Sequence, residues 1–220
     1  MTRVACGGMS DMKAVVRQGY DAVSEHYRGQ HDDSGPYAEW LDALRERIPV
    51  GGSVLDVGCG CGVPVARDLV RGGHRVTGVD ISEEQIRRAR SFVPEATFVR
   101  VDASEAEFPD ASFDAVVCLY VLFHLPLSEQ GELLGKIARW LKPGGWLLLL
   151  TGREALESRV EGWLGSDAPM VWSQADAATY RAHLDTAGLE VVEQVDVRDF
   201  LPGSSDVHSL FWAREPSQRP

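Results

Sequence analysis

The chain has no long hydrophobic run. Of its 220 residues, 44% are apolar, yet no stretch approaches the ~18 consecutive apolar residues of a membrane-spanning helix. Its first residues, MTRVACGGMSDMK, lack the apolar core of a secretion signal. We therefore expect a protein of the cytoplasm that does not act at a membrane.

Positive charge is scarce. Lys and Arg total 22 against 33 Asp and Glu, which gives a formal net charge of −11, and the sequence shows no basic stripe. A chain with this balance repels the phosphate backbone of nucleic acids. We therefore expect no nucleic-acid partner.

Cysteine is rare, and its placement excludes the usual metal and disulfide patterns. Cys59 and Cys61 lie in one glycine-rich loop, and Cys118 lies in an apolar run. A Cys-x-Cys pair without a second pair of Cys or His is a poor zinc site. We expect no metal, and we interpret Cys59 and Cys61 as small residues that fit a tight turn.

The most informative stretch that is present covers residues 53–63, which read SVLDVGCGCGV. Its first residues are apolar and β-branched, as in a buried parallel strand. Three alternating glycines follow at 58, 60 and 62, and Pro64 stands where a helix is expected to begin. A strand, a glycine turn and a helix N-terminus in so few residues predict a nucleotide-type binding corner.

Strands and helices alternate along most of the chain. The predicted strands are 54–57, 75–80, 96–101, 113–120, 146–150, 189–197 and 207–213, and the predicted helices are 11–27, 37–48, 82–90, 128–141 and 173–187. This order predicts an α/β fold, a doubly wound Rossmann-like sheet of seven mostly parallel strands with helices on both faces. Only residues 198–206 join the last two strands, so the last strand is predicted to be antiparallel.

Two segments differ from this alternation. Residues 1–50 are predicted to form an N-terminal helical lid over the binding site, or a brace on the sheet. Residues 51–220 form the binding domain itself. Within it, residues 152–175 are expected to be an insertion on the substrate side. Its residues 152–171 are predicted to be irregular or short helical, because glycines and a proline interrupt the pattern.

Three acidic residues fall at or near the ends of predicted strands. Asp56 precedes the glycine turn, Asp80 ends the second strand and Asp102 ends the third. In open α/β sheets, an acid after the second strand can accept the hydroxyls of a ribose, and the next acid can meet an adenine amino group. The alternatives are local roles: Asp80 as a helix cap, Asp102 as a turn residue, and Asp56 as a partner of the loop's backbone amides.

The glycine spacing distinguishes classes of nucleotide. A nicotinamide-binding loop follows G-x-G-x-x-G, and its third glycine would be residue 63, where this chain has Val63. No Gly-Lys-Ser/Thr follows, which excludes a Walker loop for triphosphates. The turn therefore fits a nucleoside-type ligand better than a dinucleotide or a triphosphate.

Taken together, these motifs resemble those of class I S-adenosylmethionine-dependent methyltransferases. The matching stretches, in the family's order and spacing, are Tyr20–Tyr27, 54–62, 76–82, 113–125 and 141–145. The resemblance covers about residues 20–150 and implies S-adenosyl-L-methionine as cofactor and S-adenosyl-L-homocysteine as product. It implies cofactor contacts by Tyr20, Tyr27, Asp56, Gly58, Cys59, Gly60, Asp80, Ile81, Gln85, Asp102, Ala103 and Leu119.

The implied reaction displaces a methyl group from a sulfonium by a nucleophile of the substrate. A general base contributes ~10²–10⁴-fold when that nucleophile carries a proton. His124, just after the fourth strand, is the first candidate for the base, and its alternative is a structural role in the loop before Pro126. His208, in the last strand, is the second candidate.

The segments that would hold the methyl acceptor are short, which predicts a small-molecule acceptor methylated on oxygen or nitrogen. Trp163, Met170 and Trp172 are expected either to wall its pocket or to pack under a loop. The composition, rich in Ala, Arg, Gly and Val, favours natural-product biosynthesis. We expect the protein to be a monomer or homodimer. The alternatives are an NAD(P)-dependent oxidoreductase of similar topology and a catalytically silent cofactor-binding module.

Overall fold

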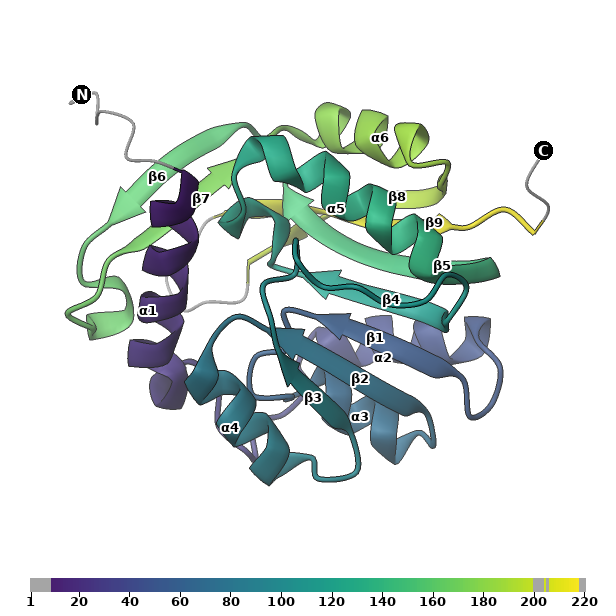
Figure 1. Cartoon of the computed structure of the whole chain (residues 1–220), viewed down its shortest axis with the longest axis horizontal. Helices are drawn as coiled ribbons and strands as arrows, with labels where there is room; N and C mark the ends of the chain where they lie inside the picture. The colour runs from purple at the N-terminus through teal and green to yellow at the C-terminus, as the bar shows by residue number, and fades with distance from the viewer. Residues whose placement is uncertain (1–8, 200–203, 205, 218–220) are drawn as a thin grey trace.

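The computed structural model describes residues 9–199, 204 and 206–217, and it contains a large sheet flanked by helices (Figure 1). The strands are β1 Ser53–Val57, β2 Arg75–Asp80, β3 Thr97–Arg100, β4 Phe113–Leu119, β5 Leu141–Gly152, β6 Leu156–Val160, β7 Met170–Gln174, β8 Glu190–Arg198 and β9 Val207–Arg214. The helices are α1 Met9–Tyr27, α2 Tyr37–Arg47, α3 Val65–Arg71, α4 Glu83–Phe92, α5 Leu127–Trp140 and α6 Ala177–Thr186, with short 3₁₀ turns η1 Leu122–His124 and η2 Trp163–Gly165.

The large sheet has seven strands in the order β3-β2-β1-β4-β5-β9-β8. All neighbours run parallel except β9, which is antiparallel to both β5 and β8. The predicted fold class is therefore confirmed. Strand order reverses between β1 and β4, and ligands in such sheets bind outside the carboxyl ends of the strands at this switch point.

Helices cover both faces of the sheet and give two separate apolar cores. On one face, α5 and α6 pack against the sheet, with Trp140 and Tyr180 fully buried between them and the strands. On the other face, α2, α3 and α4 pack, with Leu41 and Leu69 at 0% exposure. Because β4 and β5 are covered on both faces, their sequences are almost continuously apolar.

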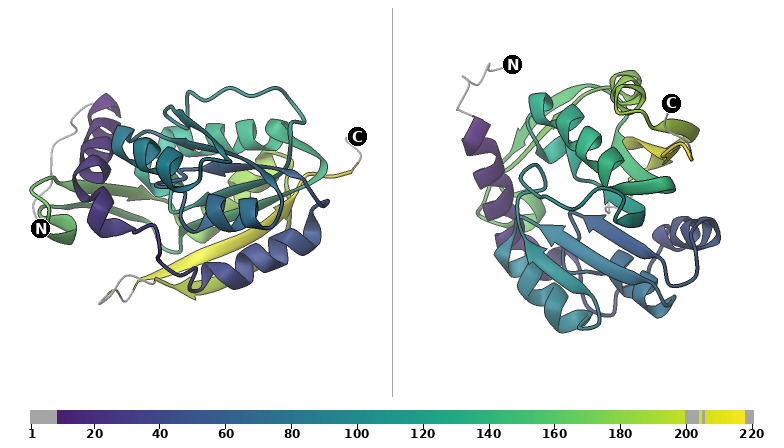
Figure 2. Two further views of the ribbon diagram at one scale, coloured as in Figure 1. Left: turned by 90° about the horizontal axis from the view of Figure 1, so that it is seen from below. Right: turned by 45° about the vertical axis from the view of Figure 1, so that its right-hand side comes forward.

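The N-terminal segment has two parts that lie in different places. Helix α2 packs on the sheet through Leu41 and Leu44. Helix α1 instead stands across the end of the sheet toward which the parallel strands point, beside β6 and β7 (Figures 1 and 2). No helix within the described ranges has the length and hydrophobicity that a membrane span requires.

The sequence prediction was wrong in the segment 152–175. In place of an irregular insertion, β6 and β7 form an antiparallel hairpin, which pairs Leu156 with Gln174 and Val160 with Met170. Two predicted helix starts were also displaced. Helix α5 begins at Leu127 without a side-chain cap, and the N-cap of α6 is Asp176, whose carboxylate accepts the Thr179 N–H at 2.8 Å.

Candidate active site

The glycine turn after β1 brings bare backbone to the carboxyl end of the sheet. Gly58, Gly60 and Gly62 all have positive φ, of 69°, 53° and 77°, a region that side-chain-bearing residues rarely adopt. At Gly58 the requirement is also steric, since a Cβ there would lie 2.2 Å from Cγ2 of Val121. The turn therefore leaves a cradle that a larger residue would fill.

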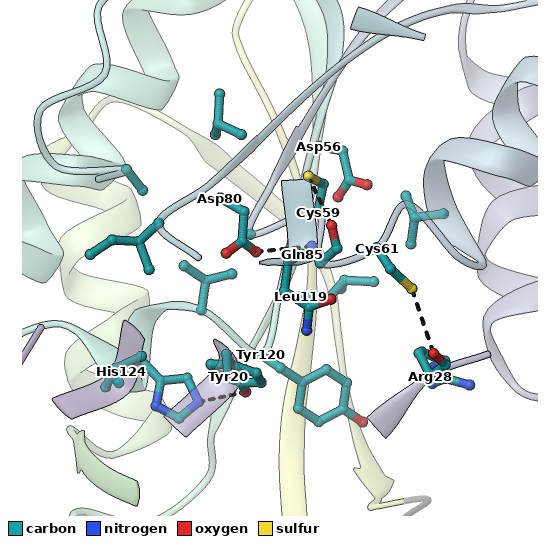
Figure 3. Close-up of a pocket in the computed structure, with 18 of the residues that line it drawn as sticks. Tyr20, Arg28, Asp56, Cys59, Cys61, Asp80, Gln85, Leu119, Tyr120 and His124 are labelled. Atoms are coloured by element: carbon teal, nitrogen blue, oxygen red, sulfur yellow. Dashed lines mark hydrogen bonds between the residues drawn. The ribbon is translucent and has the colours of Figure 1, made fainter. Parts of the chain in front are cut away.

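Asp80 connects this turn to the start of α4. One carboxylate oxygen accepts the Gly60 N–H at 2.9 Å (Figure 3). The other accepts the Ser82 N–H at 2.8 Å. Ser82 is the helix cap, because its hydroxyl accepts the Gln85 N–H at 3.1 Å. Burial raises the pKa of Asp80 to about 6, against the opposing effect of the two backbone hydrogen bonds. A carboxylate has room for further donors, so Asp80 remains able to accept ligand hydroxyls.

Asp56 has a different environment. Its side chain is 3% exposed, and its Oδ2 has no hydrogen-bond partner in the part of the chain that the structure describes. Burial, and then the neighbouring Asp80, raise its pKa well above the usual range. It does not order the loop amides, because the N–H groups of Gly58 and Cys59 both donate to the carbonyl of Val79. Asp56 is thus a buried carboxyl group whose Oδ2 has no hydrogen-bond donor among the described residues.

Asp102 lies at the far side of the same pocket with both carboxylate oxygens engaged. Its Oδ1 accepts the N–H and the hydroxyl of Ser104, each at 2.9 Å. Its Oδ2 is 2.9 Å from the ammonium of Lys13 on α1. The predicted turn role is therefore present, and any adenine contact must share this carboxylate with Lys13.

Helix α1 closes over the pocket through contacts with α4. The hydroxyl of Ser82 donates to Asp21 at 2.6 Å, and the hydroxyl of Ser24 donates to the side-chain carbonyl of Gln85 at 2.9 Å. The buried guanidinium of Arg88 donates to the backbone carbonyl of Ser24 and, at 2.5 Å, to that of Arg28. These contacts hold α1 against α4 beside the binding corner, and the role of a lid stays a prediction.

All of the residues predicted to contact the cofactor line one pocket at the carboxyl ends of β1, β2 and β4. Its wall also includes His124 and three residues that the sequence analysis did not assign, Arg28, Tyr37 and Tyr120. Cys59 and Cys61 lie in the same wall as buried free thiols, and burial raises the pKa of both. Within the described chain, no group of three His, Cys, Asp or Glu is placed to hold a metal ion.

A second cavity of about 840 Å³ adjoins the first and shares Tyr20, Tyr27 and His124 with it. The hairpin β6–β7 forms one wall, and the start of β9 forms another. Trp163 and Trp172 line this cavity, as one of the two expectations had it. Met170 does not, because its side chain is fully buried and lies against Gly19 of α1.

His124 stands where the two cavities meet, and both of its ring nitrogens are occupied. The Tyr20 hydroxyl lies 3.0 Å from Nε2 (Figure 3). The carbonyl of Val171 on β7 lies 3.0 Å from Nδ1. Because a carbonyl can only accept, Nδ1 carries the proton and Nε2 accepts from Tyr20. Burial lowers the pKa of His124 to about 4, so the ring is neutral.

Comparison with known proteins agrees with this geometry. A family model described as a methyltransferase domain matches residues 54–145. Over 84% of its length the chain is 33% identical to the 27-O-demethylrifamycin SV methyltransferase of Amycolatopsis mediterranei, of which it covers 77%. The chain belongs to the class I S-adenosylmethionine-dependent methyltransferases.

Other relatives are consistent with this assignment. The methyltransferase GfsG of Streptomyces halstedii is 29% identical over 82% of the chain and 74% of that protein. The N1-methyltransferase of 1,6-didemethyltoxoflavin from Burkholderia thailandensis, solved with S-adenosylhomocysteine bound, shares the fold with a TM-score of 0.75 and 21% identity. That match covers 98% of this chain and 93% of the other. The cofactor of this methyltransferase is S-adenosylmethionine, as predicted.

Sequence reasoning missed Tyr37 and Tyr120 because nothing in their spacing relates them. Tyr37 begins α2 and Tyr120 follows β4, yet their ring centroids lie 6.4 Å apart in the wall of the cofactor pocket. One local signal was available for Tyr120, since it is the last residue of a strand that the sequence predicted. Its φ of 63° turns the chain sharply at the end of β4.

Replacing Arg88 by Met is predicted to loosen the lid of the methyltransferase. The change removes the charged donor of the Ser24 and Arg28 carbonyls, which keep only the longer contacts with the Arg28 N–H at 3.4 Å and the Cys61 thiol at 4.0 Å. Each lost hydrogen bond to a charged group costs about 1.5–3 kcal/mol. We expect a lower melting temperature and about tenfold weaker binding of S-adenosylhomocysteine, measured by calorimetry. The control is Arg87→Met on the same helix, whose side chain is 63% exposed. Equal cofactor affinity in the two variants would contradict the role given to Arg88.

Proposed function

We propose that this methyltransferase moves a methyl group from S-adenosylmethionine to an oxygen or nitrogen of a small molecule. The observation that carries the proposal is the aromatic cavity of about 840 Å³ that opens onto the cofactor pocket. Its size lies within the ~300–1,000 Å³ typical of small-molecule sites. The names of the rifamycin and toxoflavin enzymes support an acceptor from natural-product biosynthesis.

The residues of the first pocket fit the cofactor. The bare turn at Gly58 gives its methionine end a place to lie, and Asp80 presents a carboxylate to the ribose hydroxyls. Asp56 offers an unpaired buried carboxylate of the kind that an ammonium group satisfies. Tyr20 and Tyr27 close the pocket from α1, their ring centroids 5.5 Å apart. When bound, the cofactor supplies an electrophilic methyl group on a good leaving group.

Alignment of the acceptor is the main task left to the protein. Well-oriented approach of two reactants contributes ~7–11 kcal/mol to lowering a barrier. Trp163 and Trp172 present edge-on rings 5.7 Å apart, and Tyr20 lies 5.6 Å from Trp163. These rings join α1 to the β6–β7 hairpin, so an acceptor that packs against them is positioned beside the cofactor pocket and shielded from water.

We assign His124 a positioning role, because neither ring nitrogen is free to receive a proton directly. It fixes Tyr20 of the lid to η1 and to β7. We propose further that the protein acts in the cytoplasm as a monomer or homodimer. We also propose that it has no nucleic-acid partner, which its formal charge of −11 supports.

His124→Ala and Tyr20→Phe test this role together. If His124 positions Tyr20, both variants lose the same hydrogen bond, and turnover falls by a similar factor of about ten, since such a bond contributes ~0.5–1.5 kcal/mol. If Nε2 of His124 is instead the base, Tyr20→Phe frees that nitrogen and turnover does not fall. Steady-state rates, with S-adenosylhomocysteine affinity measured alongside, separate the two outcomes.

The proposed function is tested with methyl-labelled S-adenosylmethionine and four acceptors: 27-O-demethylrifamycin SV, 1,6-didemethyltoxoflavin, bulk transfer RNA and an unfolded protein. We expect label on a small molecule and none on either macromolecule. Label on RNA or protein alone would contradict the proposal. Saturable binding of S-adenosylhomocysteine without transfer to any acceptor would favour the catalytically silent module.

A further inference from the structure

His208, the second candidate for the base in the sequence, lies in the wall of the second cavity, called here the acceptor cavity. It is the second residue of β9, and its side chain is 8% exposed. Its ring stacks on Phe123 with centroids 5.9 Å apart and meets the ring of Tyr120 edge-on at 5.2 Å. The imidazole is therefore held in one place between two aromatic rings.

One nitrogen of His208 is left unsatisfied. Nδ1 is buried and has no partner among the described residues. The backbone of Thr151 favours the protonated form of the ring, and we assign the single proton of the neutral ring to Nε2, which leaves Nδ1 to accept. Burial lowers the pKa of His208, with Asp199 and Asp206 opposing that effect. The neutral ring thus keeps a lone pair on Nδ1.

The hydroxyl of the neighbouring Tyr120 also lacks a hydrogen-bond partner in the ranges that the structure covers, and it is buried. Burial raises the pKa of Tyr120, so the hydroxyl keeps its proton and is a donor. Tyr120 lines both cavities, whereas His208 lines the acceptor cavity only. A buried polar group without a partner costs about 1–3 kcal/mol, and two adjacent ones in one wall indicate that a ligand satisfies them.

The chemistry of the pair selects the ligand group. His208 needs a donor and Tyr120 needs an acceptor, and a hydroxyl supplies both on one oxygen atom. A carbonyl or ether oxygen has no hydrogen for His208, and an ammonium has no lone pair for Tyr120. A neutral amine has a single lone pair, which cannot both accept from Tyr120 and attack the methyl carbon, whereas a hydroxyl oxygen has two. Of oxygen and nitrogen, oxygen is therefore the atom that meets both requirements and keeps an electron pair for the attack.

We propose that the methyl acceptor is a hydroxyl-bearing molecule and that His208 Nδ1 is the general base that receives the hydroxyl proton. As the oxygen–hydrogen bond breaks, its proton passes to Nδ1. The oxygen's electron pair forms the new bond to the methyl carbon, and the carbon–sulfur bond of the donor breaks to leave a neutral thioether. Tyr120 orients the attacking oxygen. The proposal rests on the proposed function, because it assigns a role in that same acceptor cavity.

The first arm of the test measures binding to the protein saturated with S-adenosylhomocysteine. The probes are 1-naphthol and naphthalene, which differ by one hydroxyl. We expect naphthol to bind about tenfold more tightly, the equivalent of one hydrogen bond. Tyr120→Phe and His208→Ala are expected to remove that preference, measured in each variant as the ratio of naphthol to naphthalene affinity. Equal affinity of the wild type for both probes would overturn the proposal.

The second arm measures methyl transfer to 1-naphthol from labelled S-adenosylmethionine. His208→Gln keeps a hydrogen-bonding side chain but cannot take the proton, so we expect turnover to fall by about 10²-fold, within the range for a lost general base. His31→Gln is the matched control, because His31 is exposed and lines neither cavity. Unchanged turnover in His208→Gln, or naphthol bound by the wild type but never methylated, would overturn the role of His208.

Failure of the proposed function has a different signature. A protein that is not a methyltransferase of small molecules shows no transfer to any small acceptor and no effect of the cavity variants. If transfer is found on an amine probe such as 1,6-didemethyltoxoflavin and never on a hydroxyl, the proposed function stands and only the present inference fails.

Discussion

Gly58→Ala is expected to abolish cofactor binding at ordinary concentrations and to destabilise the fold. The new Cβ would require a φ of 69°, which costs about 1–2 kcal/mol for a residue with a side chain. It would also lie 2.2 Å from Cγ2 of Val121, and relief of such overpacking costs about 1–3 kcal/mol more. The free energy of unfolding should therefore fall by about 2–5 kcal/mol, and S-adenosylhomocysteine affinity by at least ~100-fold, the equivalent of about 3 kcal/mol.

Two further variants separate the causes of that loss. Gly73→Ala has the same backbone strain, with φ of 83° and no atom within 4 Å of the new Cβ, but lies outside the pocket. It should lose only about 1–2 kcal/mol of stability and no affinity. Val121→Ala, added to Gly58→Ala, should restore part of both. If Gly58→Ala binds S-adenosylhomocysteine as tightly as the wild type does, the cofactor does not lie against the turn at Gly58.

The binding corner was predictable because its signals are local. Strand β1, the glycine turn and α3 fall within residues 53–71, and each element follows from residue types and spacing over a few positions. The tip of β2 followed equally, because Asp80 ends an apolar run just before a helix cap at Ser82. A residue at the carboxyl end of a predicted parallel strand lies at the edge of the sheet where the ligand binds, so its place in the site follows from its position in the sequence.

The acceptor cavity was not predictable in the same way. Strand β6 is exposed along most of its length, so it lacks the alternation of apolar and polar residues that identifies a half-buried strand. The shape of the cavity also depends on β7 and on the packing of Met170 against Gly19 of α1, two residues that are far apart in the sequence. The pairing of Tyr120 with His208 likewise arises from the sheet order, since β9 inserts between β5 and β8. Only the folded chain brings these groups together.

Asp80→Ala should weaken cofactor binding by about 10- to 150-fold. The estimate corresponds to ~1.5–3 kcal/mol for a hydrogen bond to a charged group. Asp80→Asn is the matched control for charge, because it keeps the shape of the side chain. Calorimetric titration with S-adenosylhomocysteine measures both variants, and unchanged affinity in Asp80→Ala would mean that the ribose lies elsewhere.

The pH dependence of binding gives an independent check. Because the pKa of Asp80 is raised to about 6 in the free protein, lowering the pH from 7 to 5 protonates it and removes the charge that the ribose hydroxyls would meet. Wild-type affinity should fall by about tenfold over this interval, and Asp80→Asn should show a flatter profile. Asp21 and Asp56 both interact electrostatically with Asp80, so the dependence assigned to Asp80 is the difference between the two proteins.

Stability distinguishes a binding role from a structural one. An acid whose pKa is higher in the folded than in the unfolded protein destabilises the fold as pH rises through the interval between the two values, here about 4 to 6. Above that interval Asp80 is held ionised against a desolvation cost, offset in part by the N–H groups of Gly60 and Ser82. Asp80→Asn should therefore melt close to the wild type at pH 7 while binding the cofactor poorly. A large fall in both would make Asp80 mainly an organiser of the turn, whereas a fall in affinity alone makes its charge part of the binding site.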